Sequence, residues 1–219
     1  GDGCHIVTPD DRMILIDAGE GDNMRRFLSW RYNVRDKEKP EDGGPDPFPI
    51  DHVFISHPDK DHYYGFKELF EETRLKPLRV YHNGIVERPV RSEDKIDGLY
   101  YPSSEDLGGY LEEDGERYLW EVVNSNTAMH ELINRHNGTR KQYLKTLIEA
   151  VENNPDVDFI RVKERDGFIE GFGPGEVVEL KVLGPLTERR SFGNSHRDTL
   201  IKLGAEGVTK NGHSIVLQL

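Results

Sequence analysis

The 219-residue chain contains one cysteine, no long apolar run and fewer basic than acidic side chains. A single cysteine, Cys4, excludes an intrachain disulfide and is typical of a reducing compartment. No apolar run approaches the roughly 20 residues that a membrane-spanning helix needs, and no signal peptide is recognisable. These absences favour a cytoplasmic protein without a membrane segment. The chain begins at Gly1 without a methionine, so we expect its true N-terminus to be missing.

The charge balance is strongly acidic. Lysine and arginine total 29 against 41 aspartate and glutamate residues, a formal net charge of −12. Such a surface repels phosphate backbones and disfavours a broad nucleic-acid footprint, although a local basic patch or bound cations would offset it. Hydrophobic residues make up only 35% of the chain, while 22 glycines and 12 prolines indicate many turns. The composition predicts one domain, or one domain with an insertion.

Two segments near the N-terminus predict a β-hairpin. Residues 5–8 and 12–17 have strand character, and the Pro-Asp-Asp sequence between them supplies a turn. The second strand is continuously apolar at residues 13–16, which indicates burial on both faces. Asp22 is expected to cap a following helix whose apolar face includes Met24, Phe27 and Leu28.

The sequence pattern changes near residue 83, which predicts three segments. Residues 1–82 and 155–219 are assigned to the main fold, and residues 83–154 to an insertion that lies over it. The insertion is polar and turn-rich, apart from an amphipathic helix predicted over residues 139–153. The strands predicted for the rest of the main fold are residues 53–55, 78–81, 158–162, 177–183 and 214–219.

Four metal-ligand side chains follow the predicted strand at 53–55: His57, Asp59, Asp61 and His62. Residues two apart in an extended loop point the same way, so His57 and Asp59 could hold one ion. Asp61 and His62 would then hold a second ion, at the ~3.5–4 Å spacing used in two-metal hydrolysis. Imidazole with carboxylate suits zinc, with manganese or iron as alternatives. Asp59 or Asp61 could instead cap the following helix, but four such residues together favour metal binding.

This loop resembles the characteristic HxHxDH loop of the metallo-β-lactamase superfamily, followed here by Gly65. Asp59 replaces the middle histidine, as in the ComEC-like competence-protein branch of soluble metallo-hydrolases. Residues 1–6, 13–19, 183–185 and 210–217 also resemble elements of that branch. The resemblance implies an α/β (α+β) fold, specifically a four-layer αββα sandwich with metals at one edge of its two sheets.

The resemblance also implies roles for individual residues. His57 and Asp59 would bind the first metal, Asp61 and His62 the second, and Asp17 would orient the loop from beneath. His213 could be a third ligand of the first metal or a structural histidine. Both interpretations stay open because its neighbours Asn211 and Ser214 are the more typical family residues.

The family pattern continues with a Gly-Asp turn and a later histidine, whereas this sequence stops at Leu219. We therefore expect a fold that is incomplete at both ends and a fragment that binds metal weakly or at one site. The intact protein would bind two Zn²⁺ ions, with Mn²⁺ or Fe²⁺ as alternatives.

The predicted function is metal-dependent hydrolysis of an ester or phosphodiester bond by a metal-activated water, which Asp61 would orient. The alternatives are a non-catalytic binding or sensor domain of the same fold, or a soluble partner domain of a DNA-uptake or defence system. The remaining histidines are expected to be surface or structural residues: His52, His82, His130, His136 and His196.

Overall fold

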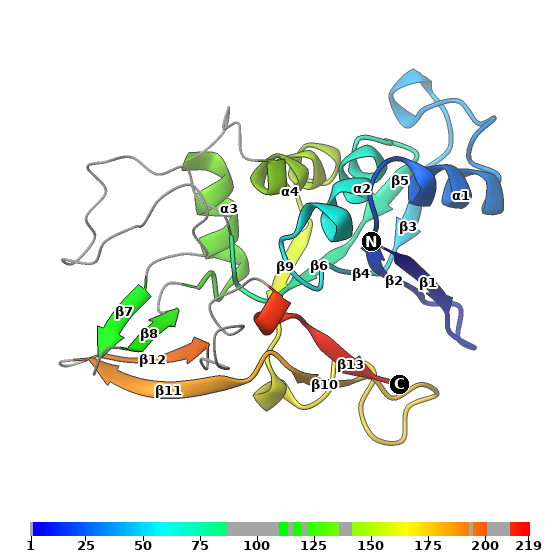
Figure 1. Cartoon of the computed structure of the whole chain (residues 1–219). Coiled ribbons are helices and arrows are strands. Elements are labelled where there is room, and N and C mark those ends of the chain that lie inside the picture. The colour runs from blue at the N-terminus through cyan, green and yellow to red at the C-terminus, as the bar shows by residue number, and fades with distance from the viewer. Residues whose placement is uncertain are drawn as a thin grey trace.

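The computed structural model describes residues 2–86, 110–113, 116–119, 122–135, 142–192, 195–200 and 211–219. At its centre lies a five-stranded sheet of order β1-β2-β4-β6-β9 (Figure 1). β1 pairs antiparallel with β2, and the other neighbours are parallel. The predicted hairpin and the buried strands that follow it are therefore confirmed. The strands of this sheet are β1 Gly3–Val7, β2 Met13–Ala18, β4 His52–Phe54, β6 Arg79–His82 and β9 Asp158–Arg161.

One face of the central sheet is covered by helices (Figure 1). Leu15, Val53 and Val80 are fully buried on this face, in one cluster with Phe66 of α2 and Leu147 of α4. Burial of such large apolar side chains is the main stabilising contribution to a core of this kind. The helices are α1 Asn23–Arg31, α2 Lys60–Phe70, α3 Asn126–Arg135 and α4 Gln142–Asn153.

The other face packs against a two-stranded sheet formed by β10 (Lys181–Gly184) and β13 (Val216–Gln218). Phe54 and Tyr81 stack at 4.3 Å between ring centroids and share a buried cluster with Val182. On the outer face of this second sheet, Leu183 and Val216 are 42% and 49% exposed. The described residues thus form a mixed α/β fold with helices on one face of the central sheet, and the expected four-layer sandwich is not shown in full.

The other elements extend the fold at its sides. β11 and β12 form an antiparallel hairpin that pairs with β8 and β7 at the left of the view in Figure 1. β3 and β5 form a short parallel pair. No helix in the described ranges is long and apolar enough to cross a bilayer. The bounds are η1 Pro40–Asp42, β3 Phe48–Ile50, β5 Leu75–Pro77, β7 Tyr110–Glu113, β8 Glu116–Leu119, η2 Glu164–Asp166, β11 Thr187–Phe192, β12 Ser195–Leu200 and η4 Asn211–His213.

Local predictions required several corrections. Asp22 makes no side-chain cap to α1; its carboxylate instead accepts from Arg25 at 2.8 Å. Phe27 is 43% exposed and packs its ring against His5, whereas Met24 and Leu28 are buried. α2 begins at Lys60, directly after Asp59, and the predicted strand at 177–183 is hydrogen-bonded as a strand only from residue 181 onward.

The predicted insertion at 83–154 falls partly on residues outside the described ranges. Its last helix, α4, starts in the described residues at Gln142, and residues 139–141 lie outside them. Leu144 and Leu147 of α4 belong to the same buried cluster as α2. The division at residues 82 and 154 stays a prediction.

Candidate metal centre

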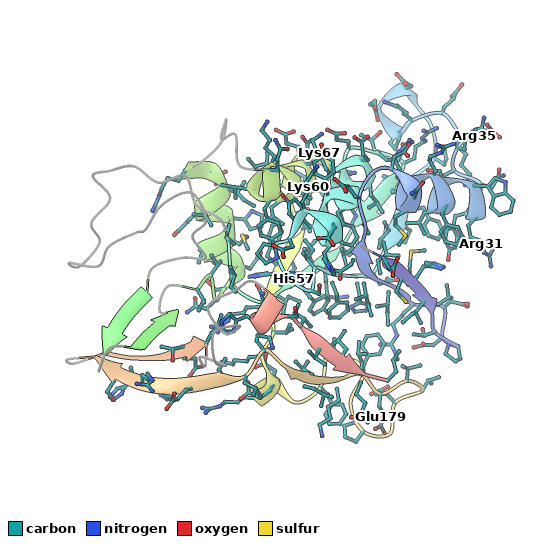
Figure 2. All side chains as sticks on the ribbon, viewed as in Figure 1. Arg31, Arg35, His57, Lys60, Lys67 and Glu179 are labelled. Carbon is teal, nitrogen blue, oxygen red and sulfur yellow. The ribbon has the colours of Figure 1, made fainter. Side chains whose placement is uncertain are left out.

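The predicted ligands lie where the parallel strands of the central sheet end. Asp17 is near the end of β2, and His57 follows β4 by three residues. Parallel strands end at the same edge of a sheet, which is why segments far apart in sequence meet there. Figure 2 shows His57 at this edge, in the region between α2 and η4.

Asp17 connects the strand end to the loop above it. Its Oδ1 accepts from the Ser56 backbone N–H at 2.8 Å, and its Oδ2 accepts from Ser56 Oγ at 2.7 Å. The same Oδ2 lies 2.8 Å from His62 Nδ1. Asp17 is buried and adopts a left-handed backbone with φ of 54°, which is costly for a residue with a Cβ. These contacts hold the carboxylate beneath the loop.

His57 is held by two serines. Its Nδ1 lies 2.9 Å from Ser56 Oγ and 3.2 Å from Ser214 Oγ, while its Nε2 lies 3.5 Å from Asp59 Oδ2. Burial lowers the pKa of His57, the nearby His62 lowers it further, and the Asp59 carboxylate opposes both effects. The neutral ring is the form that binds a metal.

His62 makes a similar pair of contacts. Its Nδ1 faces Asp17, and its Nε2 lies 3.7 Å from Asp61 Oδ2. The His57 and His62 ring centroids are 4.1 Å apart. In both residues, therefore, Nδ1 is engaged within the protein and Nε2 faces a carboxylate. A metal-binding histidine usually has its second nitrogen held in this way.

The chemistry of these donors suits a transition-metal ion, but their arrangement is only partial. The loop forms two histidine–aspartate pairs, and no group of three or more metal-ligand side chains is assembled in the described ranges. Asp59 occupies the position before α2 with an extended backbone and makes no side-chain capping bond, so the capping interpretation gains no support there. The ligand assignments of His57, Asp59, Asp61, His62 and His213 stay predictions.

His213 reaches the loop from the other end of the chain. It is 1% exposed, and its carbonyl accepts from Asn83 Nδ2 at 2.9 Å. Two residues later, the backbone N–H of Ile215 donates to the Ser56 carbonyl at 2.9 Å. These contacts position the residues around Ser214 against the loop. Asn83 was not identified from the sequence because a lone asparagine after a strand carries no motif.

Three of the remaining histidines have local partners. His52 Nδ1 lies 3.0 Å from Tyr81 Oη, and His130 Nε2 lies 3.1 Å from the Val157 carbonyl. His196 Nδ1 lies 2.7 Å from Ser191 Oγ. The structural interpretation is thus confirmed for His52 and His130, whereas His136 lies outside the described residues.

His82 is an exception. It is completely buried, and its Nδ1 accepts from the Gly84 backbone N–H at 3.0 Å. Its Nε2 has no hydrogen-bond partner in the described part of the chain. Burial, and secondarily Arg161, lowers its pKa to about 3.

Comparison with known proteins agrees with this geometry. The family model described as "Metallo-beta-lactamase superfamily" matches residues 4–130, which is more than half of the chain and includes Asp17 and the loop at 57–62. No curated protein and no solved structure matches the chain. The match supports the superfamily and gives no support for the ComEC-like branch. The chain therefore belongs to the metallo-beta-lactamase superfamily.

Proposed function

We propose that this protein is a metal-dependent hydrolase whose centre is the loop at residues 57–62. The observation that carries the proposal is the contact pattern that His57 and His62 share. Each Nδ1 is held by the protein and each Nε2 faces a carboxylate. Membership of the superfamily, most of whose members are hydrolases, supports it.

The residues are assigned as the sequence predicts. His57 and Asp59 would hold one ion, with His213 as the candidate third ligand, and Asp61 and His62 the second. Zinc suits these donors best, with manganese or iron as alternatives. When bound, such ions supply Lewis acids that polarise the substrate oxygen and make water a stronger acid.

The chain's own residues would orient this centre. Asp17 fixes His62 and the backbone of Ser56, and Ser56 with Ser214 fixes the ring of His57. Asp61 lies in the first turn of α2 with its side chain 55% exposed, so it can accept a hydrogen bond from the attacking water. The substrate would be an ester or phosphodiester. The ComEC-like resemblance of the sequence favours phosphodiesters, and the charge of −12 disfavours a long nucleic acid.

Metal analysis combined with a phosphodiesterase assay tests this function. The purified protein should take up zinc or manganese and hydrolyse bis(p-nitrophenyl) phosphate. His57→Ala should abolish hydrolysis and metal uptake at that position while the far-ultraviolet circular dichroism stays unchanged. His130→Gln is the matched control, because His130 lies on α3 and contacts the Val157 carbonyl just before β9, and it belongs to neither histidine–aspartate pair. Unchanged turnover in His57→Ala would show that the loop is structural.

A second candidate is a binding domain of this fold without catalysis. It is favoured by the pairwise arrangement of the ligands in the described ranges. The same assay separates the two, since a binding domain would take up metal or ligand without turnover.

A further inference from the structure

A cavity of about 500 Å³ lies beyond the end of β9, beside the β11–β12 hairpin. Small-molecule sites typically have volumes of about 300–1,000 Å³. Three of its side chains are cationic and one is a carboxylate, so its lining is net positive in a chain that is strongly acidic overall. We call it the arginine pocket, and its lining residues are Val122, Asn124, Arg161, Lys163, Arg189, His196 and Asp198.

Arg161 forms one wall of the arginine pocket and has unused donors. It is the last residue of β9, and its Nε and Nη2 are buried without a hydrogen-bond partner in the described ranges. Burial lowers its pKa, opposed by the nearby carboxylates of Asp198, Asp166 and Glu164. A guanidinium has five N–H donors and no acceptor, so unsatisfied donors are costly when buried.

The carboxylates around Arg161 are engaged by other groups. Asp198 pairs with Lys163 Nζ at 2.6 Å, and Asp166 accepts from the Lys163 backbone N–H at 2.9 Å. Glu164 accepts from the Thr187 backbone N–H at 3.0 Å. Arg161 thus has three carboxylates nearby, yet its Nε and Nη2 donors receive no acceptor from the described residues.

The opposite wall comes from the hairpin. Arg189 pairs in register with Asp198, and Ser191 pairs with His196. Residues two apart on a strand share one face of a sheet, so Arg189, Asp198 and His196 lie on the same face. Arg190 lies on the other face and pairs with Glu188 at 3.0 Å. The register therefore gathers the polar groups of the hairpin on the side of Arg161.

We propose that the arginine pocket binds a phosphate group, as inorganic phosphate or as the phosphate of a small ester. Arginine's planar fork matches phosphate oxygens in two-point hydrogen bonds, which would satisfy the Arg161 donors that the nearby carboxylates leave unused. Lys163 donates from Nζ to Asp198, which balances its charge, and the same ammonium group can donate a second hydrogen bond to the ligand. This site goes beyond the proposed hydrolase centre and requires no metal.

The arginine pocket is physically connected to the loop at 57–62. Gly84 packs against Arg161, where an added Cβ would lie 2.9 Å from Nε. The preceding Asn83 donates to the His213 carbonyl, and Ile215 donates to Ser56. Both sites therefore lie along the edge at which the parallel strands end.

Calorimetric titration tests the proposal with the full chain, stripped of metal and then freed of chelator. The probes are inorganic phosphate and glycerol phosphate, at low ionic strength. We expect saturable binding at one site per chain, and the tighter probe identifies the source of the phosphate. Arg189→Gln should weaken binding by about tenfold or more, as expected for a lost charge-assisted hydrogen bond. Arg161→Gln should have at least as large an effect.

Arg190→Gln is the matched control, because it removes the same charge from the same strand on the opposite face. Its affinity should stay within about twofold of the wild type, since it does not contact the ligand. His57→Ala should bind phosphate with the affinity of the wild type, because His57 does not line the arginine pocket. Loss of the proposed hydrolase centre can therefore be distinguished from loss of the phosphate site. The proposal is overturned if neither probe binds saturably, if Arg190→Gln weakens binding as much as Arg189→Gln, or if His57→Ala abolishes it. Should Arg161→Gln fail to fold, Arg189→Gln still decides the outcome.

Discussion

Replacement of Asp17 by alanine should destabilise the protein more than most single substitutions. Asp17 is 7% exposed, and its carboxylate contacts Ser56 N, Ser56 Oγ and His62 Nδ1 at 2.7–2.8 Å. Its loss leaves a buried backbone donor unsatisfied, which costs about 1–3 kcal/mol, and removes two further hydrogen bonds of about 1 kcal/mol each. Alanine also loses about 1 kcal/mol in a left-handed conformation. We therefore expect a total decrease of roughly 4–6 kcal/mol in the free energy of unfolding.

Asp11 provides an internal control for the backbone contribution. It also has a positive φ, 62°, but lies exposed in the β1–β2 turn. Asp11→Ala should therefore show the strain of about 1 kcal/mol without the loss of the buried contacts. The difference between the two variants measures the contribution of the Asp17 carboxylate.

Urea denaturation followed by circular dichroism measures both values. Asp17→Asn is the milder variant to use if Asp17→Ala does not fold, since asparagine tolerates positive φ and keeps an acceptor for the Ser56 N–H. If the proposed centre is correct, Asp17→Asn should also weaken metal binding by roughly 10- to 100-fold. Equal losses for Asp17→Ala and Asp11→Ala would refute the role assigned to the carboxylate.

Two further predictions concern buried positions, one on β4 and one on α2. Burial lowers the pKa of His52 to about 4, so on acidification this side chain takes up a proton in the unfolded chain before it does so in the folded chain. The contribution of His52 to the free energy of unfolding should be fully present above about pH 6.5 and should fall by roughly 3 kcal/mol as the pH drops through 4. His52→Phe should flatten this part of the pH profile in urea titrations, and an unchanged slope would contradict the assignment. Gly65→Ala should lower the melting temperature despite alanine's higher helix propensity, because the new Cβ would lie 2.4 Å from the Ala18 carbonyl oxygen; a raised melting temperature would show that α2 can move away from β2.

Local patterns were sufficient to predict several parts of the molecule. The hairpin, the buried strand before the loop and the concentration of ligand types at residues 57–62 each depend on residues that are close together in the sequence. Turn residues, apolar runs and ligand spacing act over such distances, so they can be recognised without the fold. The position of Asp17 beneath the loop came from the family resemblance, and its contacts with Ser56 and His62 agree with it.

The tertiary structure decided what depends on packing between distant segments. Phe27 matched the helical period of Met24 and Leu28 but lies at the margin of the core, beside His5. The arginine pocket joins β9 to a hairpin nearly thirty residues away, and neither Arg161 nor Arg189 carries a motif. Whether a charged side chain is solvated or buried without a partner depends on which strands meet around it. The register of β11 with β12 places Arg189 and Arg190 on opposite faces of the hairpin, although the two residues are adjacent in sequence.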